Sequence, residues 1–219
     1  MSTSSFAQKK YKWVQGKAEL LDGEKFEGKL IYRPDDIRGL IQLKKEERIL
    51  TYSPFDVSLF SYYDKKTKKN RVFHSLPIFN YSDESFQPEF LELLFEGELI
   101  TVFKQHVAVK RPDQPLEAKV DWEFIILADM TSGKMEYYSY PNEMTKRRKV
   151  SFWEAFEFKN PFAKYAYDKR LLTDMVGNKS AILREYTKKE ELRIKQVEGL
   201  VKVLAKYHEL MEAGYNLVN

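Results

Sequence analysis

The chain has 219 residues, of which 43% are hydrophobic and 15% aromatic, so it can form a packed core and is not expected to be disordered. Its formal net charge of +4 is too small to indicate nucleic-acid binding without a local basic patch. The absence of cysteine excludes disulfides, thiolate-bound metals and thiol nucleophiles. No run of about 18 apolar residues occurs, so no transmembrane helix is expected.

The first residues resemble the end of a secretory signal. Ser5 and Ala7 are small residues at the two positions that a signal peptidase reads before a cut, and the polar run 8–10 follows them. A charged and an apolar region of a full signal peptide are not present in this sequence. Two interpretations stay open, the start of a mature exported protein and an ordinary polar start, and in both we expect residues 1–10 to be mobile.

Residues 11–140 have the pattern of a β-rich domain. The segments 13–21 and 25–32 flank Asp22-Gly23, a dipeptide that favours a tight hairpin. Other strands are expected at 40–43, 48–52, 57–63, 71–76, 90–95, 99–104, 122–128 and 134–140. Their connections are short, which predicts antiparallel pairing because parallel strands need long crossovers.

Residues 151–215 have a helical pattern. Ser151 is expected to cap a short helix, and Asn160-Pro161 to begin a second, with Phe162, Tyr165, Ala166 and Leu172 on its inner face. Thr187 and Glu190 have the spacing of a capping box, which predicts a last helix from 188 to about 213, before Gly214. The apolar stripe expected on that helix consists of Ile194, Val197, Val201, Leu204 and Met211, flanked by Leu200 and Tyr207.

These patterns predict an α+β protein. An antiparallel sheet system over 11–140, either a barrel or two packed sheets, would be followed by the helical segment 151–215, which packs on it. We expect the sheets and helices to form one structural unit, preceded by the mobile residues 1–10.

Residues that usually carry catalysis are few. His74, His106 and His208 lack the spacing of metal ligands, and His208 falls on the apolar stripe, where a half-buried, hydrogen-bonded histidine is expected. The sequence contains no nucleophile elbow, zinc-protease motif or phosphate-binding loop. We therefore expect no catalytic residue, metal site or cofactor. A hydrolase using acids among Glu84, Glu89, Glu92, Glu96 and Glu98 is kept as an alternative, although such residues more often line solvated strand faces.

Two basic clusters lie beside tyrosines and form the candidate binding residues. Basic loops next to aromatic strand faces can hold a single-stranded nucleic acid, or they can keep hairpin tips soluble. Tyrosine and arginine are also common anchors of protein interfaces. The candidate residues are Tyr62, Tyr63, Lys65, Lys66, Lys68, Lys69, Arg71, Tyr137, Tyr138, Tyr140, Arg147 and Arg148.

The segment 17–30, with its Asp22-Gly23 turn and Gly28, resembles the start of poorly characterised, β-rich exported proteins of Bacteroidota. The segments 52–57 and 90–97 and the pair Asn160-Pro161 are similar to later parts of that pattern, and the cleavage-like start at 5–10 is similar to theirs. The resemblance implies a periplasmic or cell-envelope location and supplies no activity. The first hairpin, with Asp22-Gly23 at the turn and Gly28 before the next strand, also resembles Sm-like or SH3-like small barrels, a resemblance that slightly favours the nucleic-acid interpretation.

From these features we expect a non-catalytic binding or accessory protein of the bacterial cell envelope. It would bind a protein partner through tyrosine-rich strand faces or edges. The alternatives are a cytoplasmic small-barrel protein that binds nucleic acid through its basic loops, and the hydrolase named above.

Overall fold

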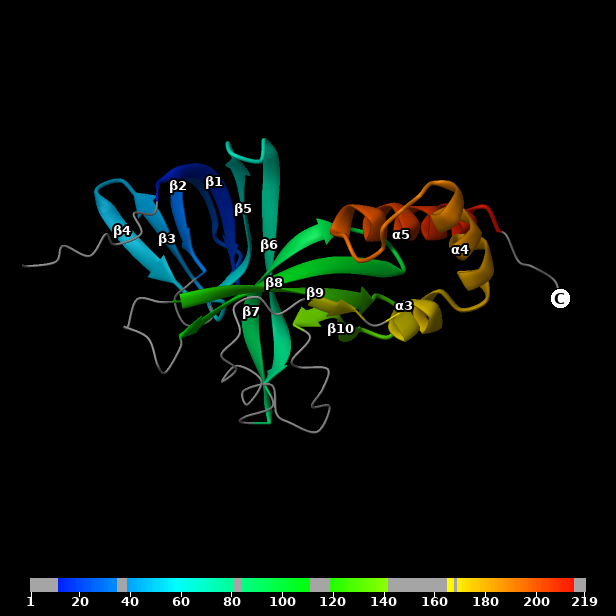
Figure 1. The fold of residues 1–219 in the computed structure, drawn as a ribbon. Coiled ribbons are helices and arrows are strands. Elements are labelled where there is room, and N and C mark those ends of the chain that lie inside the picture. The colour runs from blue at the N-terminus through cyan, green and yellow to red at the C-terminus, as the bar shows by residue number, and fades with distance from the viewer. Residues whose placement is uncertain are drawn as a thin grey trace, which may run out of the picture. The chain divides into compact units, whose positions relative to one another are not determined.

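The computed structural model describes residues 12–34, 39–80, 84–110, 119–141, 165–167 and 169–214 (Figure 1). The strands are β1 (Val14–Leu20), β2 (Lys25–Arg33), β3 (Leu40–Lys45), β4 (Arg48–Tyr52), β5 (Val57–Asp64), β6 (Lys69–Asn80), β7 (Ser85–Phe95), β8 (Ile100–Lys110), β9 (Lys119–Asp129), β10 (Lys134–Pro141) and β11 (Tyr165–Tyr167). The helices are α3 (Lys169–Val176), the 3-10 turn η1 (Gly177–Lys179), α4 (Ser180–Lys189) and α5 (Val197–Glu212).

The chain divides into two compact units. The first consists of residues 1–78 with 86–90, and the second of 79–85 with 91–219. The division therefore falls within the strands β6 and β7, and not between the strands and the helices.

The first unit is an antiparallel sheet with the strand order β6-β5-β1-β2-β3-β4. The expected hairpin between β1 and β2 is present: Gly23 has a φ of 89°, and the amide of Glu24 donates a 2.9 Å hydrogen bond to the Asp22 carboxylate. The alternating pattern of β1 to β3 buries one side of the sheet. Its core contains Ala18, Leu20, Leu30, Ile41, Leu43, Val57, Phe60, Phe73 and Phe90.

Aromatic rings fill the centre of this core. Phe60 and Phe73 face each other across β5 and β6 and stack with their centroids 4.6 Å apart. The ring of Tyr32 tilts against both, and Phe90 meets Phe60 edge to face at 4.9 Å. The unit is thus held together by rings that meet on one side of the sheet.

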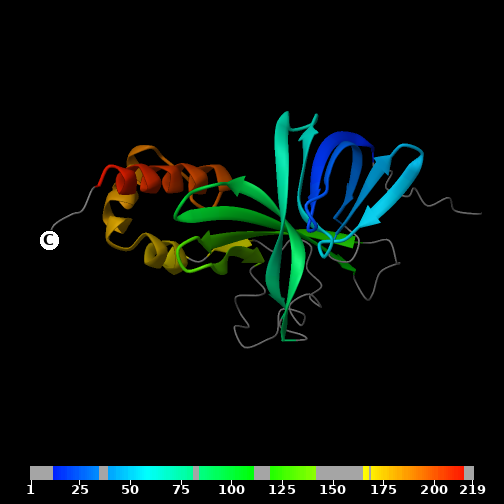
Figure 2. The ribbon, with the colours of Figure 1, turned by 180° about the vertical axis from the view of Figure 1, so that it is seen from behind.

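The second unit combines the strand order β11-β10-β9-β8-β7 with the helices (Figure 2). Strands β8 and β9 pair without interruption from Ile100↔Asp129 to Lys110↔Lys119. One side of the strands packs against the helices in a core formed by Ile100, Val102, Ile125, Leu127, Tyr138, Leu172, Val176, Leu183, Leu200, Val203, Leu204, Tyr207 and Leu210. The Tyr138 hydroxyl donates a 3.0 Å hydrogen bond to the carbonyl of Ile194, which ties the turn before α5 to the sheet.

The α+β class, with antiparallel strands followed by C-terminal helices, is therefore confirmed. The described strand pairs are all antiparallel, as the short connections predicted. Each strand order is linear and ends at β4 or β11, so the described strands do not close into a barrel. Within the described segments, no helix is long and apolar enough to cross a membrane.

The helix boundaries differ from the prediction. Tyr165 and Ala166 belong to β11, which pairs with β10, because the hydrogen-bonding edge of β10 accepts this segment as a strand. The expected capping box is wrong, since Thr187 lies inside α4 and its hydroxyl donates to the Leu183 carbonyl at 2.6 Å. The helix starts expected at Ser151 and Asn160-Pro161 lie outside the described residues.

The buried side of α5 is also rotated from the expected one. Leu200, Val203, Leu204, Tyr207 and Leu210 are buried, whereas Met211 is 41% exposed. The helix begins at Val197, nine residues later than the capping box predicted, and only contact with the sheet decides which of its apolar residues point inward. Gly214 follows the helix with a φ of 63°, as expected for a residue after a helix C-terminus.

Candidate binding face on the first unit

The side of the first sheet opposite its core is the outer face, and it carries a row of exposed side chains. Cross-strand pairs run from Gln15 to Lys29, from Lys29 to Lys44 and from Lys44 to Ile49. All four side chains are exposed, Ile49 by 56%. Because side chains alternate between the two faces of a strand, Tyr63 on β5 lies on this same face, and it is 49% exposed. The row therefore presents two cations between an aliphatic and an aromatic side chain.

The charges of this face are matched on one strand pair and mismatched on the next. Between β1 and β2, Lys17 lies opposite Glu27 with 3.2 Å between Nζ and Oε2, and Glu19 lies opposite Lys25 at 3.7 Å. Between β2 and β3, Lys29 lies directly opposite Lys44, and neither forms an ion pair with any described residue. Like charges placed directly opposite each other destabilise a sheet, so the repulsion between these two lysines is unfavourable in the free protein.

The hairpin between β5 and β6 adds further lysines. Lys65, Lys66, Lys68 and Lys69 are all exposed at its tip. Asp64 fixes the turn by accepting a 2.8 Å hydrogen bond from the amide of Lys66. That hydrogen bond is the main reason why the pKa of Asp64 is lowered, and the positive charge of Arg71 contributes in the same direction. The four lysines are thus held on an ordered turn.

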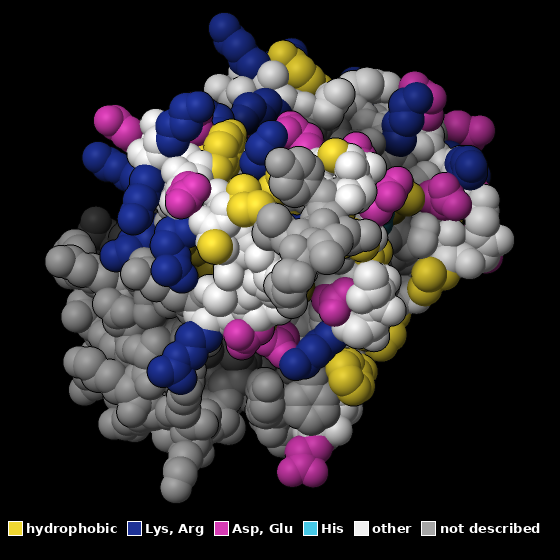
Figure 3. All heavy atoms as spheres, turned by 90° about the vertical axis from the view of Figure 1, so that its right-hand side faces the viewer, with side chains coloured by type: hydrophobic (Ala, Val, Ile, Leu, Met, Phe, Trp, Pro, Cys, Tyr) yellow, Lys and Arg dark blue, Asp and Glu magenta, His cyan; other side chains and the backbone are white. Residues whose placement is uncertain are grey.

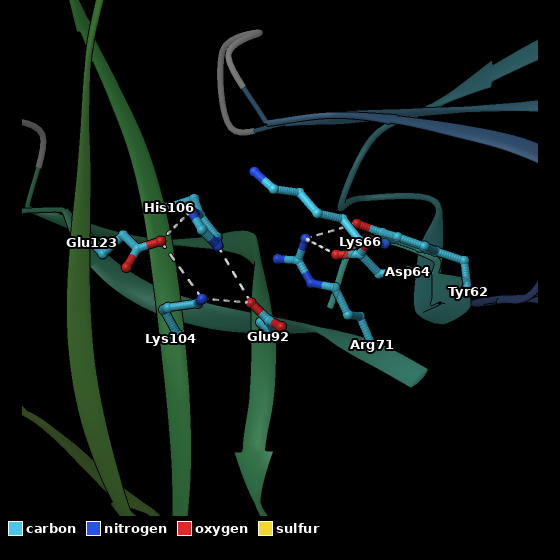
Figure 4. Close-up of polar contacts among 8 residues, drawn as sticks. All are labelled: Tyr62, Asp64, Lys66, Arg71, Glu92, Lys104, His106 and Glu123. Atoms are coloured by element: carbon cyan, nitrogen blue, oxygen red, sulfur yellow. Dashed lines mark hydrogen bonds and ion pairs between the residues drawn. The ribbon is translucent and has the colours of Figure 1, made fainter. Parts of the chain in front are cut away.

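Arg71 and Tyr62 serve the core instead of the surface (Figure 4). The Arg71 Nη1 group donates a 3.0 Å hydrogen bond to the Tyr62 hydroxyl and lies 4.0 Å from the Asp64 carboxylate. Its guanidinium covers the rings of Phe73 and Tyr62, at 5.0 and 5.7 Å from their centroids. Both residues close the end of the aromatic stack, so the candidate face retains Tyr63 and the lysines without them.

The second group of candidate residues is placed differently. Tyr138 is 1% exposed and belongs to the core of the second unit. Tyr137 is half-buried, donates a 3.0 Å hydrogen bond to Gln105 Oε1 and meets Phe124 edge to face. Tyr140 lies in β10, opposite Ala166, and its side chain is outside the described part of the structure, as are Arg147 and Arg148. Of the two tyrosines whose side chains are described, Tyr138 is therefore part of the core and Tyr137 is only partly exposed.

A group of charged side chains in the described part of the second unit surrounds Lys104 (Figure 4). Lys104 Nζ lies 3.0 Å from Glu92 Oε2 and 3.6 Å from Glu123 Oε1. The two ring nitrogens of His106 face the same two carboxylates, at 3.4 and 3.6 Å. Lys104 therefore lies between two carboxylates, on the same strand face as the core residue Ile125, with which it pairs. In the described residues, these four side chains form one network of close polar contacts.

The other two histidines occupy structural positions. His208 is half-buried, and its Nε2 accepts a 3.4 Å hydrogen bond from the amide of Ile100, as expected for a hydrogen-bonded histidine on the buried side of a helix. A side chain at Gly97 would overlap this ring, which explains a glycine at that position. His74 pairs with Leu59 on β5. No cluster of three potential metal ligands occurs in the described portion of the chain.

The sequence alone does not predict that two lysines lie opposite each other on β2 and β3. Lys29 and Lys44 are 15 positions apart, and their juxtaposition depends on the register between β2 and β3, which no short motif specifies. Comparison of the chain with protein-family models, curated proteins and solved structures found no match.

Proposed function

We propose that this chain is a non-catalytic binding protein of the bacterial cell envelope that binds an acidic protein partner through the outer face of its first unit. The observation that carries the proposal is the Lys29–Lys44 pair, which keeps two like charges opposite each other on an exposed face. An acidic partner would neutralise both cations, so the repulsion present in the free protein would be relieved on binding. The envelope location rests on the cleavage-like start at Ser5 and Ala7.

The neighbouring side chains support a protein surface as the partner. Ile49 is adjacent to Lys44, and Tyr63 lies at the other end of the row, beyond Gln15. Both are large and exposed, and such side chains contribute apolar and aromatic contacts at interfaces. Elsewhere on the same face the lysines are already paired, as Lys17 is with Glu27. Among the lysines that β1 to β3 place on this face, the unpaired charge is therefore concentrated at one row.

Binding of poly-L-glutamate, an acidic polypeptide, tests this surface. We expect the double variant Lys29→Gln/Lys44→Gln to bind about tenfold more weakly than the unmodified protein, because two unpaired cations are lost. The matched control is Lys17→Gln/Lys25→Gln, which removes the same charge from lysines that already have partners. Isothermal titration at low salt measures both affinities.

Equal weakening by the two double variants would show that only net charge matters and would contradict a specific face. Replacing Ile49 with Ser separates the apolar contacts of the face from its charge interactions. It should weaken capture of the native partner from a periplasmic extract while changing poly-L-glutamate binding little, because the polymer provides few apolar groups.

A single-stranded nucleic acid is a second candidate partner, favoured by the four exposed lysines beside Tyr63. It predicts binding of oligo-dT that falls steeply with salt and weakens when Tyr63 becomes Ala, since stacking on the ring is lost. Binding of oligo-dT more tightly than poly-L-glutamate at physiological salt would replace the first proposal. Cell fractionation also distinguishes the two proposals, because binding of an acidic partner in the cell envelope requires the protein to lie in the periplasm or on the envelope.

A further inference from the structure

The helices of the second unit line a half-open cavity of about 280 Å³. Its apolar wall is contributed by all three helices and by the turn before α5: Leu172, Val176, Leu183, Ile194 and Val203. All five side chains belong to or pack on the helix–sheet core, with Leu172, Val176, Leu183 and Val203 themselves buried. The wall is therefore held in place by side chains that also pack in the core of the unit.

One corner of the cavity is polar and basic. Ser180 and Arg184 both line it and lie four residues apart on α4, which places them on the same side of that helix. The Arg184 side chain is exposed and forms no ion pair with the described residues, and the Ser180 hydroxyl has no hydrogen-bond partner among them. Thr187, the next lining residue on this side of α4, already donates its hydroxyl to Leu183.

We infer that this cavity binds a small amphipathic carboxylate, with its hydrocarbon chain against the apolar wall and its carboxylate on Arg184 and Ser180. A guanidinium binds a carboxylate through two parallel hydrogen bonds, and a serine hydroxyl adds a third donor. The volume lies near the lower end of the range for small-molecule sites, about 300 Å³, which suits a medium-chain fatty acid. The face drawn in Figure 3 shows hydrophobic side chains at the surface among lysine and arginine side chains.

The site is independent of the outer face of the first unit. It uses no residue of the Lys29–Lys44 row, and its ligand is a small molecule instead of a protein. The variant Lys29→Gln/Lys44→Gln should therefore bind a fatty acid as the unmodified protein does.

Titration of the full chain with decanoate tests the inference. We expect one saturable site, and we expect Arg184→Glu to weaken it by about tenfold or more because the carboxylate then meets a like charge. The control is Lys188→Glu, which makes the same charge change one turn further along α4 at a residue that does not line the cavity. Both side chains are exposed, so both variants should fold, and a thermal melt verifies this.

Two further measurements make the outcome decisive. Decyltrimethylammonium has the same hydrocarbon chain with a cation, and it should bind Arg184→Glu more tightly than the unmodified protein. Methyl NMR should show decanoate-induced shifts at Leu172, Leu183 and Val203. Decanoate binding that does not saturate, or shifted methyl groups that lie away from the cavity, would overturn the inference because the ligand then does not enter the cavity. Equal weakening of decanoate binding by Arg184→Glu and Lys188→Glu would also overturn it, because the site is then not selective for an anion at Arg184.

Discussion

The strands of the two units differ in how many of their faces are buried. In the first unit the core lies on one face of the sheet, and the other face exposes Lys17, Lys29, Lys44 and Ile49. In the second unit β8 and β9 bury Val102 and Leu127 against the helices, and they also bury Phe124 and Ile126 on the opposite face. A strand face that is buried must be apolar or fully hydrogen-bonded, whereas an exposed face can vary its charges. The first unit is therefore the one that can keep a mismatched pair of charges on an exposed face.

Buried polar groups of the second unit follow this rule. Gln105 is 1% exposed and accepts a hydrogen bond from Tyr137. Thr101 is 4% exposed and donates a 3.0 Å hydrogen bond to the Gly97 carbonyl. No such constraint acts on Lys29 or Lys44, whose ammonium groups are hydrated.

The largest test of this comparison truncates an isoleucine on each sheet. Ile126→Ala should reduce the free energy of unfolding by about 2–5 kcal/mol, because Ile126 is 1% exposed and a cavity would remain. Ile49→Ala, on the outer face of the first unit, should change it by less than about 0.5 kcal/mol. Urea denaturation measures both. Similar losses for the two variants would show that the outer face is covered.

The same comparison can be made with a hydroxyl group. Tyr137→Phe should lower the free energy of unfolding by about 1–3 kcal/mol, because the buried side-chain oxygen of Gln105 then loses the hydroxyl that donates a hydrogen bond to it. Tyr63→Phe removes the same atom from a half-exposed ring and should leave stability unchanged. The difference between the two melting curves is the measurement. A stable Tyr137→Phe protein would mean that water or another group replaces the hydroxyl.

The hairpin between β9 and β10 gives a pH-dependent test. Hydrogen bonds from the hydroxyls of Thr131 and Ser132, together with their amides, lower the pKa of Asp129 to about 2. Since the pKa in the folded state is below the unfolded value of about 3.9, the carboxylate stabilises the protein above about pH 4, and this contribution is lost as the pH falls towards 2.

Asp129→Asn should therefore lower the free energy of unfolding by about 1 kcal/mol at pH 7, a value that allows for solvent screening. Near pH 2 the substitution should leave the free energy of unfolding unchanged. Asp22→Asn, in the hairpin of the first unit, should cost less because Asp22 accepts a single hydrogen bond there, from the Glu24 amide. Stability measured from pH 2 to 7 distinguishes them. A loss that is independent of pH would assign the effect to the turn conformation instead of the charge.

The smallest effect should have opposite signs at two lysines of the outer face. Lys29→Gln removes a repulsion and should stabilise the protein by about 0.2–1 kcal/mol, whereas Lys17→Gln removes an attraction and should destabilise it slightly. Both effects should shrink in high salt. Denaturation at low and high salt measures them, and a destabilising Lys29→Gln would show that Lys29 has a partner and would weaken the proposed function.

Features that depend on neighbouring residues were predictable. The turn at Asp22-Gly23, the strands on either side of it and the glycine after α5 all follow from backbone preferences within a few positions. The lysine-rich tip of the hairpin between β5 and β6 is likewise visible as a run in the sequence. Among the candidate residues, the tip lysines and Tyr63 are the ones that this local reasoning placed on an exposed surface.

Features that depend on distant residues were not predictable. Tyr62 and Tyr63 are adjacent tyrosines, yet one lies in the aromatic core and the other on the outer face, because strand residues alternate and only the packing decides which side is buried. The segment at Tyr165 has a helical pattern but pairs with β10 as a strand.

By itself, the sequence determined the α+β class, the antiparallel strands and their turns, because these are set by alternation and turn residues a few positions apart. Tertiary structure alone decided the division into two units, the buried side of α5 and the juxtaposition of Lys29 with Lys44. Each of these depends on contacts between segments far apart in the chain. The free energy of such contacts comes from surfaces that match in three dimensions, and a single sequence does not reveal which surfaces will meet.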